Sequence, residues 1–218
     1  GEVVCQAVNA KTNEAEKTFA PKPFTLAAGA EQTLAIAEPW ANAKLWWPDE
    51  PNLYLLRASV KVGGKSVDVS DTRFGFREWA WAGRDFTLNG IPWHGWCDCF
   101  TADTPQAWLD FYRKNNERMM RFWGTKWQGM PPDQALGFFD ENGVVVRRSG
   151  ILDGEAIGYF AVERDPDLKK LYNSEIKMQL MDNWRDQMVA QVKGERNHPS
   201  VFIWSIENEW LYINCINL

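Results

Sequence analysis

The sequence has few of the residues on which metal and nucleic-acid chemistry depend. Only two of its 218 residues are histidine, and its four cysteines show none of the paired spacings typical of zinc sites. Lysine and arginine total 24 against 29 aspartate and glutamate, the formal net charge is -5, and no basic run occurs. We therefore expect no nucleic-acid partner, no bound metal and no other cofactor.

Long apolar segments and phosphate-binding loops are missing as well. No apolar stretch approaches the roughly 20 residues needed to span a bilayer, so the sequence predicts no membrane partner. No glycine-rich phosphate loop follows the first strand expected in the second half of the chain, which disfavours a nucleotide-binding sheet. Gly1 opens directly on a strand-like run without an initiator Met or a signal segment, so we expect a piece of a longer protein.

Tryptophan, by contrast, is abundant, with 13 in 218 residues. Large aromatic side chains fill cores, and for any single tryptophan this is the favoured interpretation. Sugars present flat apolar faces that indole rings can recognise, so the total also indicates a carbohydrate-binding surface.

Residues 1–76 carry the pattern of an all-β domain. Short alternating runs are separated by Asn, Gly, Pro and Lys, as in a sandwich of antiparallel strands, with Gly63-Gly64 as a hairpin turn. The runs cover residues 3–8, 24–26, 33–36, 53–62 and 66–70. This part has no histidine and no carboxylate cluster, which favours a scaffold role. Residues 77–90 follow as a connecting β-hairpin that ends in the turn Asn89-Gly90.

Residues 91–218 alternate strand-like and helix-like segments. Strands are expected at 91–95, 119–123 and 144–146, and after Pro199. Helices are expected to begin at Thr104-Pro105, with Trp108, Phe111 and Tyr112 on one face, and at Pro131-Pro132, ending at Asn142-Gly143; a third covers 173–193. The segment 147–172 is long enough to be an active-site insertion.

Such alternation predicts a parallel sheet, either doubly wound or a (β/α) barrel. A full barrel needs roughly 250 residues, so the chain would stop after about four of the eight repeats.

The sequence NHPSVFIWSIENEW at 197–210 is the stretch most suggestive of chemistry. Its apolar run predicts a strand buried on both faces, with Asn208 and Glu209 just past its carboxyl end. An acid walled there by Trp123, Trp204 and Trp210 would have a raised pKa, which suits a general acid. The alternative is a solvated loop beyond the strand, and spacing alone favours neither.

Several motifs occur in a fixed order along the chain: LWWP at 45–48, RFGFRE at 73–78, LNG at 88–90, MRFWG at 120–124, and RNHPSV at 196–201 leading to Asn208 and Glu209. Together they resemble glycoside hydrolase family 2, which includes β-galactosidases, β-glucuronidases, β-mannosidases and exo-β-glucosaminidases. The resemblance implies a multidomain β plus α/β fold. An immunoglobulin-like β-sandwich, incomplete at its N-terminus, occupies 1–76, and the N-terminal half of a TIM-barrel catalytic domain occupies 91–218.

The resemblance also implies roles for single residues. Glu209 would be the general acid/base, Asn208 would bind the sugar 2-substituent, and Arg121 would support the catalytic carboxylates. Trp123 with Gly124 looks more like the mannosidase and glucosaminidase branch. Further substrate contacts would come from residues near the barrel mouth, namely His94, Trp96, Asp98 and Trp210, although the family's usual Asn-Arg-His pattern is missing around 94–98. His198 is expected to stabilise a turn.

The implied reaction is retaining hydrolysis of a β-glycoside by two carboxylates about 5 Å apart. The family's nucleophile lies on a seventh strand, and Asp98, Asp153 and Glu155 cannot be assigned to its place, so we expect the isolated chain to be inactive or weakly active. One alternative is a non-catalytic carbohydrate-binding or structural module with a Trp-lined surface. A further hypothesis is a homo-oligomer formed through the exposed edges of two half barrels.

Overall fold

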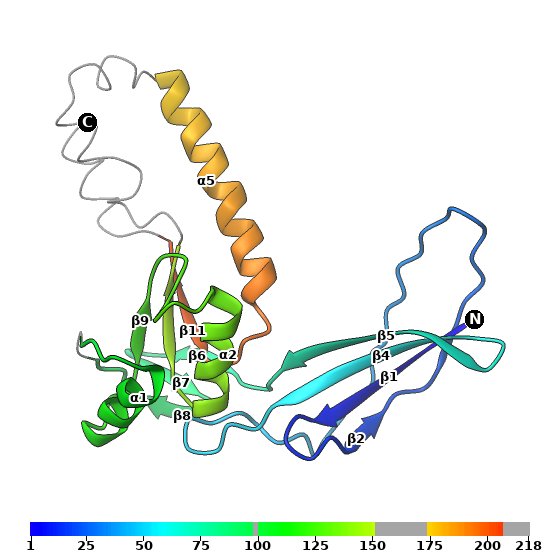
Figure 1. Ribbon diagram of the computed structural model, residues 1–218, viewed down its shortest axis with the longest axis horizontal. Helices are drawn as coiled ribbons and strands as arrows, with labels where there is room; N and C mark the ends of the chain where they lie inside the picture. Colours follow the sequence, from blue (N-terminus) through cyan, green and yellow to red (C-terminus); the bar gives the residue numbers. More distant parts are fainter. Residues whose placement is uncertain (98–99, 151–173, 207–218) are drawn as a thin grey trace.

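A computed structural model describes residues 1–97, 100–150 and 174–206 of the chain. Figure 1 shows an elongated antiparallel sheet at one end of the molecule and an α/β unit at the other. No helix in these ranges is both long and apolar enough to cross a membrane.

The N-terminal part is one five-stranded antiparallel sheet, in the order β2-β1-β4-β5 with β3 beside β1. The turn between β4 and β5 uses Gly63 and Gly64, whose φ angles of 57° and 79° suit a tight hairpin. The all-β prediction and this turn are confirmed. The strands are β1 (Glu2–Asn9), β2 (Ala15–Thr18), β3 (Lys22–Pro23), β4 (Tyr54–Val62) and β5 (Lys65–Phe74).

The strands expected at 24–26 and 33–36 are wrong. Leu34 and Ile36 are partly buried while Thr33 and Ala35 are exposed, so residues 33–36 do alternate, yet they pair with no neighbouring strand. In Figure 1 the chain between β3 and β4 leaves the sheet as a long excursion. Alternation reports the two sides of an extended chain, whereas a strand also requires a hydrogen-bonded partner.

A second antiparallel sheet follows, made of β6 (Trp79–Ala82), β7 (Asp85–Leu88) and β8 (Ile91–Trp93). The turn between β7 and β8 is Asn89-Gly90, with φ angles of 50° and 81°, as predicted. This tight turn folds the chain straight back onto β7, so the expectation that residues 91–95 begin the parallel sheet is wrong.

The chain reaches the parallel sheet just after β8. The carbonyl of Trp96 accepts hydrogen bonds from the backbone N–H groups of Arg118 and Met119, at 2.9 and 3.1 Å. Residue 96 thus lies beside the start of the next strand, β9 (Met120–Phe122).

Three parallel strands form the α/β unit, in the order β11-β10-β9. They are β9, β10 (Val146–Ser149) and β11 (Val201–Ser205), and the helices between and before them are α1 (Pro105–Lys114), α2 (Pro132–Asn142) and α5 (Ser174–Glu195). Parallel strands that alternate with helices confirm the predicted partial (β/α) barrel. Only the C-terminal part of α5 lies near the sheet (Figure 1).

Two details of the strands differ from expectation. The third strand begins at Val146, not Val144, because the N–H of Val144 still donates to the carbonyl of Phe139 at the end of α2. Ile203 in β11 is 38% exposed, so this strand is not buried on both faces. The helices cover one face of the sheet, and the other face is only partly covered.

The helix ends are where the sequence placed them. The hydroxyl of Thr104 accepts a hydrogen bond from the N–H of Ala107 at 3.1 Å, with Pro105 in the first turn of α1. Helix α2 ends at Gly143, whose φ is 68°, and a Cβ there would collide with the carbonyl oxygen of Pro48. Both predicted helix boundaries are therefore confirmed.

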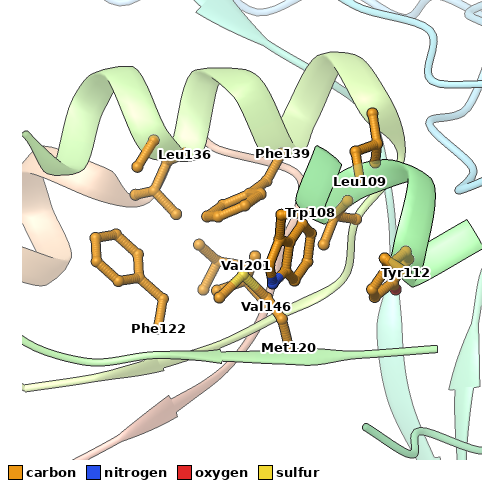
Figure 2. Close-up of a cluster of buried hydrophobic side chains, with 11 residues drawn as sticks. Trp108, Leu109, Tyr112, Met120, Phe122, Leu136, Phe139, Val146 and Val201 are labelled. Atoms are coloured by element: carbon orange, nitrogen blue, oxygen red, sulfur yellow. The ribbon is translucent and has the colours of Figure 1, made fainter. Parts of the chain in front are cut away.

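The main core lies between α1, α2 and the covered face of the parallel sheet (Figure 2). Trp108 and Tyr112 are buried in it as predicted, whereas Phe111 is 43% exposed and packs on Phe100 at its edge. The other buried members are Leu109, Met120, Phe122, Ala135, Leu136, Phe139, Val144, Val146 and Val201.

A second core closes the amino end of the parallel sheet. Its buried members are Trp46, Leu53, Leu88 and Val145, and Trp79, Trp93 and Phe202 pack against them. Trp79, Leu88 and Trp93 belong to the second antiparallel sheet, Phe202 belongs to the parallel sheet, and Trp46 and Leu53 lie in the segment before β4. The second antiparallel sheet and this segment therefore support the end of the α/β unit opposite the carboxyl ends of its strands.

Asp140, near the end of α2, connects these parts and is only 1% exposed. One carboxylate oxygen accepts from the N–H of Ser200 at 3.0 Å, and the other lies 2.6 Å from Nδ1 of His198. Arg73 of β5 approaches the same carboxylate at 3.8 Å, and the carbonyl of Asp140 accepts from the indole N–H of Trp46 at 2.9 Å. The turn-stabilising role predicted for His198 is confirmed.

We expect Asp140→Ala to lower the free energy of unfolding by about 3 kcal/mol, because it leaves the buried N–H of Ser200 without an acceptor and Arg73 without its buried partner. Denaturant unfolding measures the change. The control is Glu141→Ala, which removes a 59% exposed carboxylate paired with the same Arg73 and should cost less than about 1 kcal/mol. Equal losses for the two variants would contradict the central role of Asp140.

Candidate functional site

A pocket of about 510 Å³ opens beyond the carboxyl end of β9. Parallel α/β sheets place ligand sites at this edge, because the loops that follow the strands meet there. The described lining residues are mostly aromatic or basic: Cys97, Phe100, Thr101, Ala102, Trp108, Met120, Arg121, Phe122, Trp123, Lys126, Trp127 and Gln128.

The loop from β9 to α2 builds most of the pocket wall. Gly124 turns the chain with a φ of 75° directly after Trp123. Gln128 and Gly129, with φ angles of 51° and 80°, form a second tight turn that is closed by mutual backbone hydrogen bonds between Trp127 and Met130 at 3.0 and 2.9 Å. Two turns within six residues therefore fix where the indole rings of this loop lie.

Strand alternation assigns the residues of β9 to opposite sides. Phe122 is buried in the main core, whereas Arg121 and Trp123 lie on the other side. The guanidinium of Arg121 lies 5.2 Å from the ring centre of Trp123, a cation–π contact, and Trp123 is 50% exposed. Trp123 thus presents an indole to the pocket with a positive charge behind it.

The charge of the pocket is positive over the residues that the structure describes. Arg121 and the exposed Lys126 both line it, and no carboxylate does within the described ranges. An aromatic wall that carries two cations suits a ligand with a flat apolar face and an anionic group.

A second arginine lies beside Arg121 on the same face of the sheet. Arg147 of β10 is its register partner, and it donates to the hydroxyl of Ser205 at 2.9 Å. Arg121 approaches the hydroxyl of Ser149 at 3.4 Å. Like charges side by side on neighbouring strands are destabilising unless an anion compensates them, so this edge favours carboxylates or an anionic ligand.

Sequence reasoning missed Arg147, Lys126 and Trp127. Arg147 was assigned to a loop because the third strand was expected at 144–146; with the observed bounds of β10, alternation places it opposite Arg148 and next to Arg121. Lys126 and Trp127 follow no periodic signal, since two left-handed turns determine their places.

The predicted site residues divide into three groups. Arg121 and Trp123 are brought together in the pocket. His94 and Trp96 are exposed after β8 and are not among the described lining residues, so their roles stay predictions. The remaining candidates, Asp98, Asp153, Glu155, Asn208, Glu209 and Trp210, lie outside the described residues.

Trp204 of β11, which was expected beside Glu209, packs against the main core and is not among the described residues that line the pocket. Because Glu209 lies outside the described residues, the contact between the two stays a prediction. Over the parts of the chain that the structure describes, no three His, Cys, Asp or Glu side chains form a group that could hold a metal ion.

Sequence profiles of one family match both halves of the chain. The profile described as glycosyl hydrolases family 2 matches residues 2–77, and the profile of the family's TIM barrel domain matches residues 132–217. A Formosa agariphila protein provisionally named β-glucuronidase is 29% identical over 192 residues, which cover 82% of this chain and 17% of that protein.

Solved structures show the same fold. A calcium-binding mutant of Bacteroides uniformis β-glucuronidase 2 is 21% identical, with a TM-score of 0.69 over 99% of this chain and 25% of its own. Parabacteroides merdae β-glucuronidase is 22% identical, with a TM-score of 0.60 over 95% of this chain and 25% of its own. The chain therefore spans well under half the length of each of these relatives.

The two pocket-lining tryptophans of the loop after β9 differ in how much they contribute to stability. Trp127 packs against Trp108, Phe138 and Phe139 at ring-centre distances of 5.2, 5.6 and 4.6 Å, so Trp127→Ala should lower the free energy of unfolding by about 3 kcal/mol. The matched variant Trp123→Ala loses mainly the contact with Arg121 and should cost about 1 kcal/mol or less. Denaturant unfolding of both variants tests this, and a reversed order of stability would contradict it.

Proposed function

Because the chain belongs to glycosyl hydrolase family 2, we propose that the protein containing it hydrolyses the O-glycosidic bonds of β-linked sugars. The observation that carries this proposal is the match of both family profiles, in order, around an aromatic and basic pocket at the carboxyl end of β9. Family membership supports the reaction class, and the pocket supports a sugar-sized ligand.

The substrate we propose is a β-glycoside of an acidic sugar, with a β-glucuronide as the first choice. Lys126 and Arg121 give the pocket a positive charge that suits a sugar carboxylate. Trp123 offers an indole surface for the apolar face of a sugar ring. The relatives reported above are named β-glucuronidases, which favours this choice over the mannosidase and glucosaminidase branch that Trp123-Gly124 suggested.

The mechanism in this proposal is retaining. Glu209, four residues beyond the end of β11 in the sequence, protonates the leaving-group oxygen and later accepts a proton from the attacking water. A second carboxylate, which no described residue of the pocket supplies, attacks the anomeric carbon and forms the glycosyl ester that water cleaves. Asn208 hydrogen-bonds the substituent at C2, and Arg121 keeps the nucleophilic carboxylate ionised and oriented.

Glu209→Gln tests the reaction. In the protein that contains this chain, kcat for 4-nitrophenyl β-D-glucuronide should fall at least about 100-fold, because the amide cannot accept a proton from the water that cleaves the glycosyl ester. The control is Glu14→Gln on an exposed turn of the N-terminal sheet, which should leave the kinetics unchanged. Undiminished activity of Glu209→Gln would exclude this residue as the acid/base. Absence of activity of the parent on aryl β-glucuronides, galactosides, glucosides and mannosides would overturn the proposed function.

Lys126→Met tests the acidic substrate. We expect KM for the aryl β-glucuronide to rise about tenfold, since one charge-assisted contact to the sugar carboxylate is lost. KM for the matching aryl β-glucoside, which lacks the carboxylate, should change less than twofold. Lys114→Met, at the exposed end of α1, is the control and should change neither. A similar rise in KM for both substrates would show that Lys126 does not bind the sugar carboxylate.

A further inference from the structure

Arg148 is a fully buried cation on the core side of β10, with 0% of its surface exposed. Its guanidinium lies 4.2 Å from the ring centre of Phe122 and forms a two-pronged ion pair with Glu195 at the end of α5, at 2.8 and 3.0 Å. Gln191 adds hydrogen bonds to Glu195 at 3.4 Å and to the carbonyl of Ser149 at 3.2 Å. This polar cluster lies directly beneath the β9 end of the pocket.

The remaining nitrogen of Arg148 reaches backbone carbonyls. Its Nη1 donates to the carbonyls of Phe122 and Gly124 at 3.4 and 3.1 Å, and to that of Ser149 at 3.0 Å. The first two carbonyls flank Trp123, one on each side. Arg148 therefore holds the 122–123 peptide, directly before Trp123, and the 124–125 peptide, one residue beyond it, without lining the pocket itself.

Stability alone does not account for a charged pair in this place. Replacing a buried ion pair by well-packed apolar residues is often neutral or stabilising, because removing two charges from water is costly. A planar guanidinium, however, can bind a carboxylate with one edge and carbonyls with another, which neither an apolar residue nor a lysine can do. The ion pair therefore serves to hold the backbone at the end of β9 in one conformation, and this role, not a gain in folding stability, accounts for a charged pair at this place.

We propose that Arg148, oriented by Glu195, is a positioning residue that fixes the β9 end so that Trp123 and Arg121 face the substrate. Gly124, with its φ of 75°, would otherwise let the chain turn differently after Trp123. This inference rests on the proposed glycosidase function for its kinetic consequence, and on the contacts above for its structural one.

Arg148→Lys tests the proposal, because lysine keeps the positive charge but lacks the planar guanidinium that binds Glu195 and the backbone carbonyls at the same time. In the protein that contains this chain, KM for 4-nitrophenyl β-D-glucuronide should rise about tenfold, with kcat changed less. Backbone amides of residues 122–128 should exchange with deuterium at least about ten times faster, while those of β4 are unchanged. Glu195→Gln, which retains one acceptor, should give the same pattern at about threefold. Arg185→Lys is the matched control, since it alters an exposed pair with Asp182 and should change nothing.

Two outcomes would overturn the proposal. If Arg148→Lys and Glu195→Gln lower Tm but leave KM, kcat and exchange at 122–128 within twofold of the parent, the pair is structural only. If Arg148→Lys does not fold, the same criteria applied to Glu195→Gln decide. Should the parent hydrolyse no aryl β-glycoside, the proposed function fails, and the exchange measurement alone decides whether Arg148 fixes the β9 end.

Discussion

The buried carboxylate of Asp140 is the interaction on which the relation between the sheets depends. It holds the turn before β11 through His198 and Ser200, and it receives Arg73 from the antiparallel sheet. Arg77 strengthens the same junction by donating to the carbonyls of Pro199 and Val201, each at 3.3 Å. Burial lowers the pKa of Arg77, and the charge of Asp140 opposes that shift. The two charges therefore support each other where neither could be buried alone.

This junction matters for the site because it lies at the opposite end of the same strand. The turn at His198 and Pro199 fixes where β11 enters the sheet, and the register with β10 then fixes Ser205 beside Ser149. A one-residue slip would move every side chain of the strand to the other face. The turn before β11 thus determines which side chains β11 presents at its carboxyl end, about one strand length away.

The sequence predicted helix ends and tight turns well, but it did not predict which strands pair with one another. The cap at Thr104, the end of α2 at Gly143 and the turn at Asn89-Gly90 each depend on residues within a few positions, so the residue types suffice. The segment 33–36 alternates without a partner, and β8 pairs backward instead of joining the parallel sheet. Both errors concern contacts between distant segments. Arg121 and Trp123 were found through a motif, whereas Arg147 required the true bounds of β10.

The three arginines of β9 and β10 show how one sheet serves two purposes. Arg148 faces the core, and Glu195 neutralises its charge inside the protein, so this support does not depend on any ligand. Arg147 faces the other side, and its described hydrogen bond goes to the neutral hydroxyl of Ser205. The charge of Arg148, which is paired with Glu195, holds the local backbone in place. The charge of Arg147, whose described partner is a neutral hydroxyl, attracts anions to its side of the sheet. Alternation along β10 therefore places Arg148, whose charge is matched inside the core, and Arg147, on the opposite face of the sheet, one residue apart.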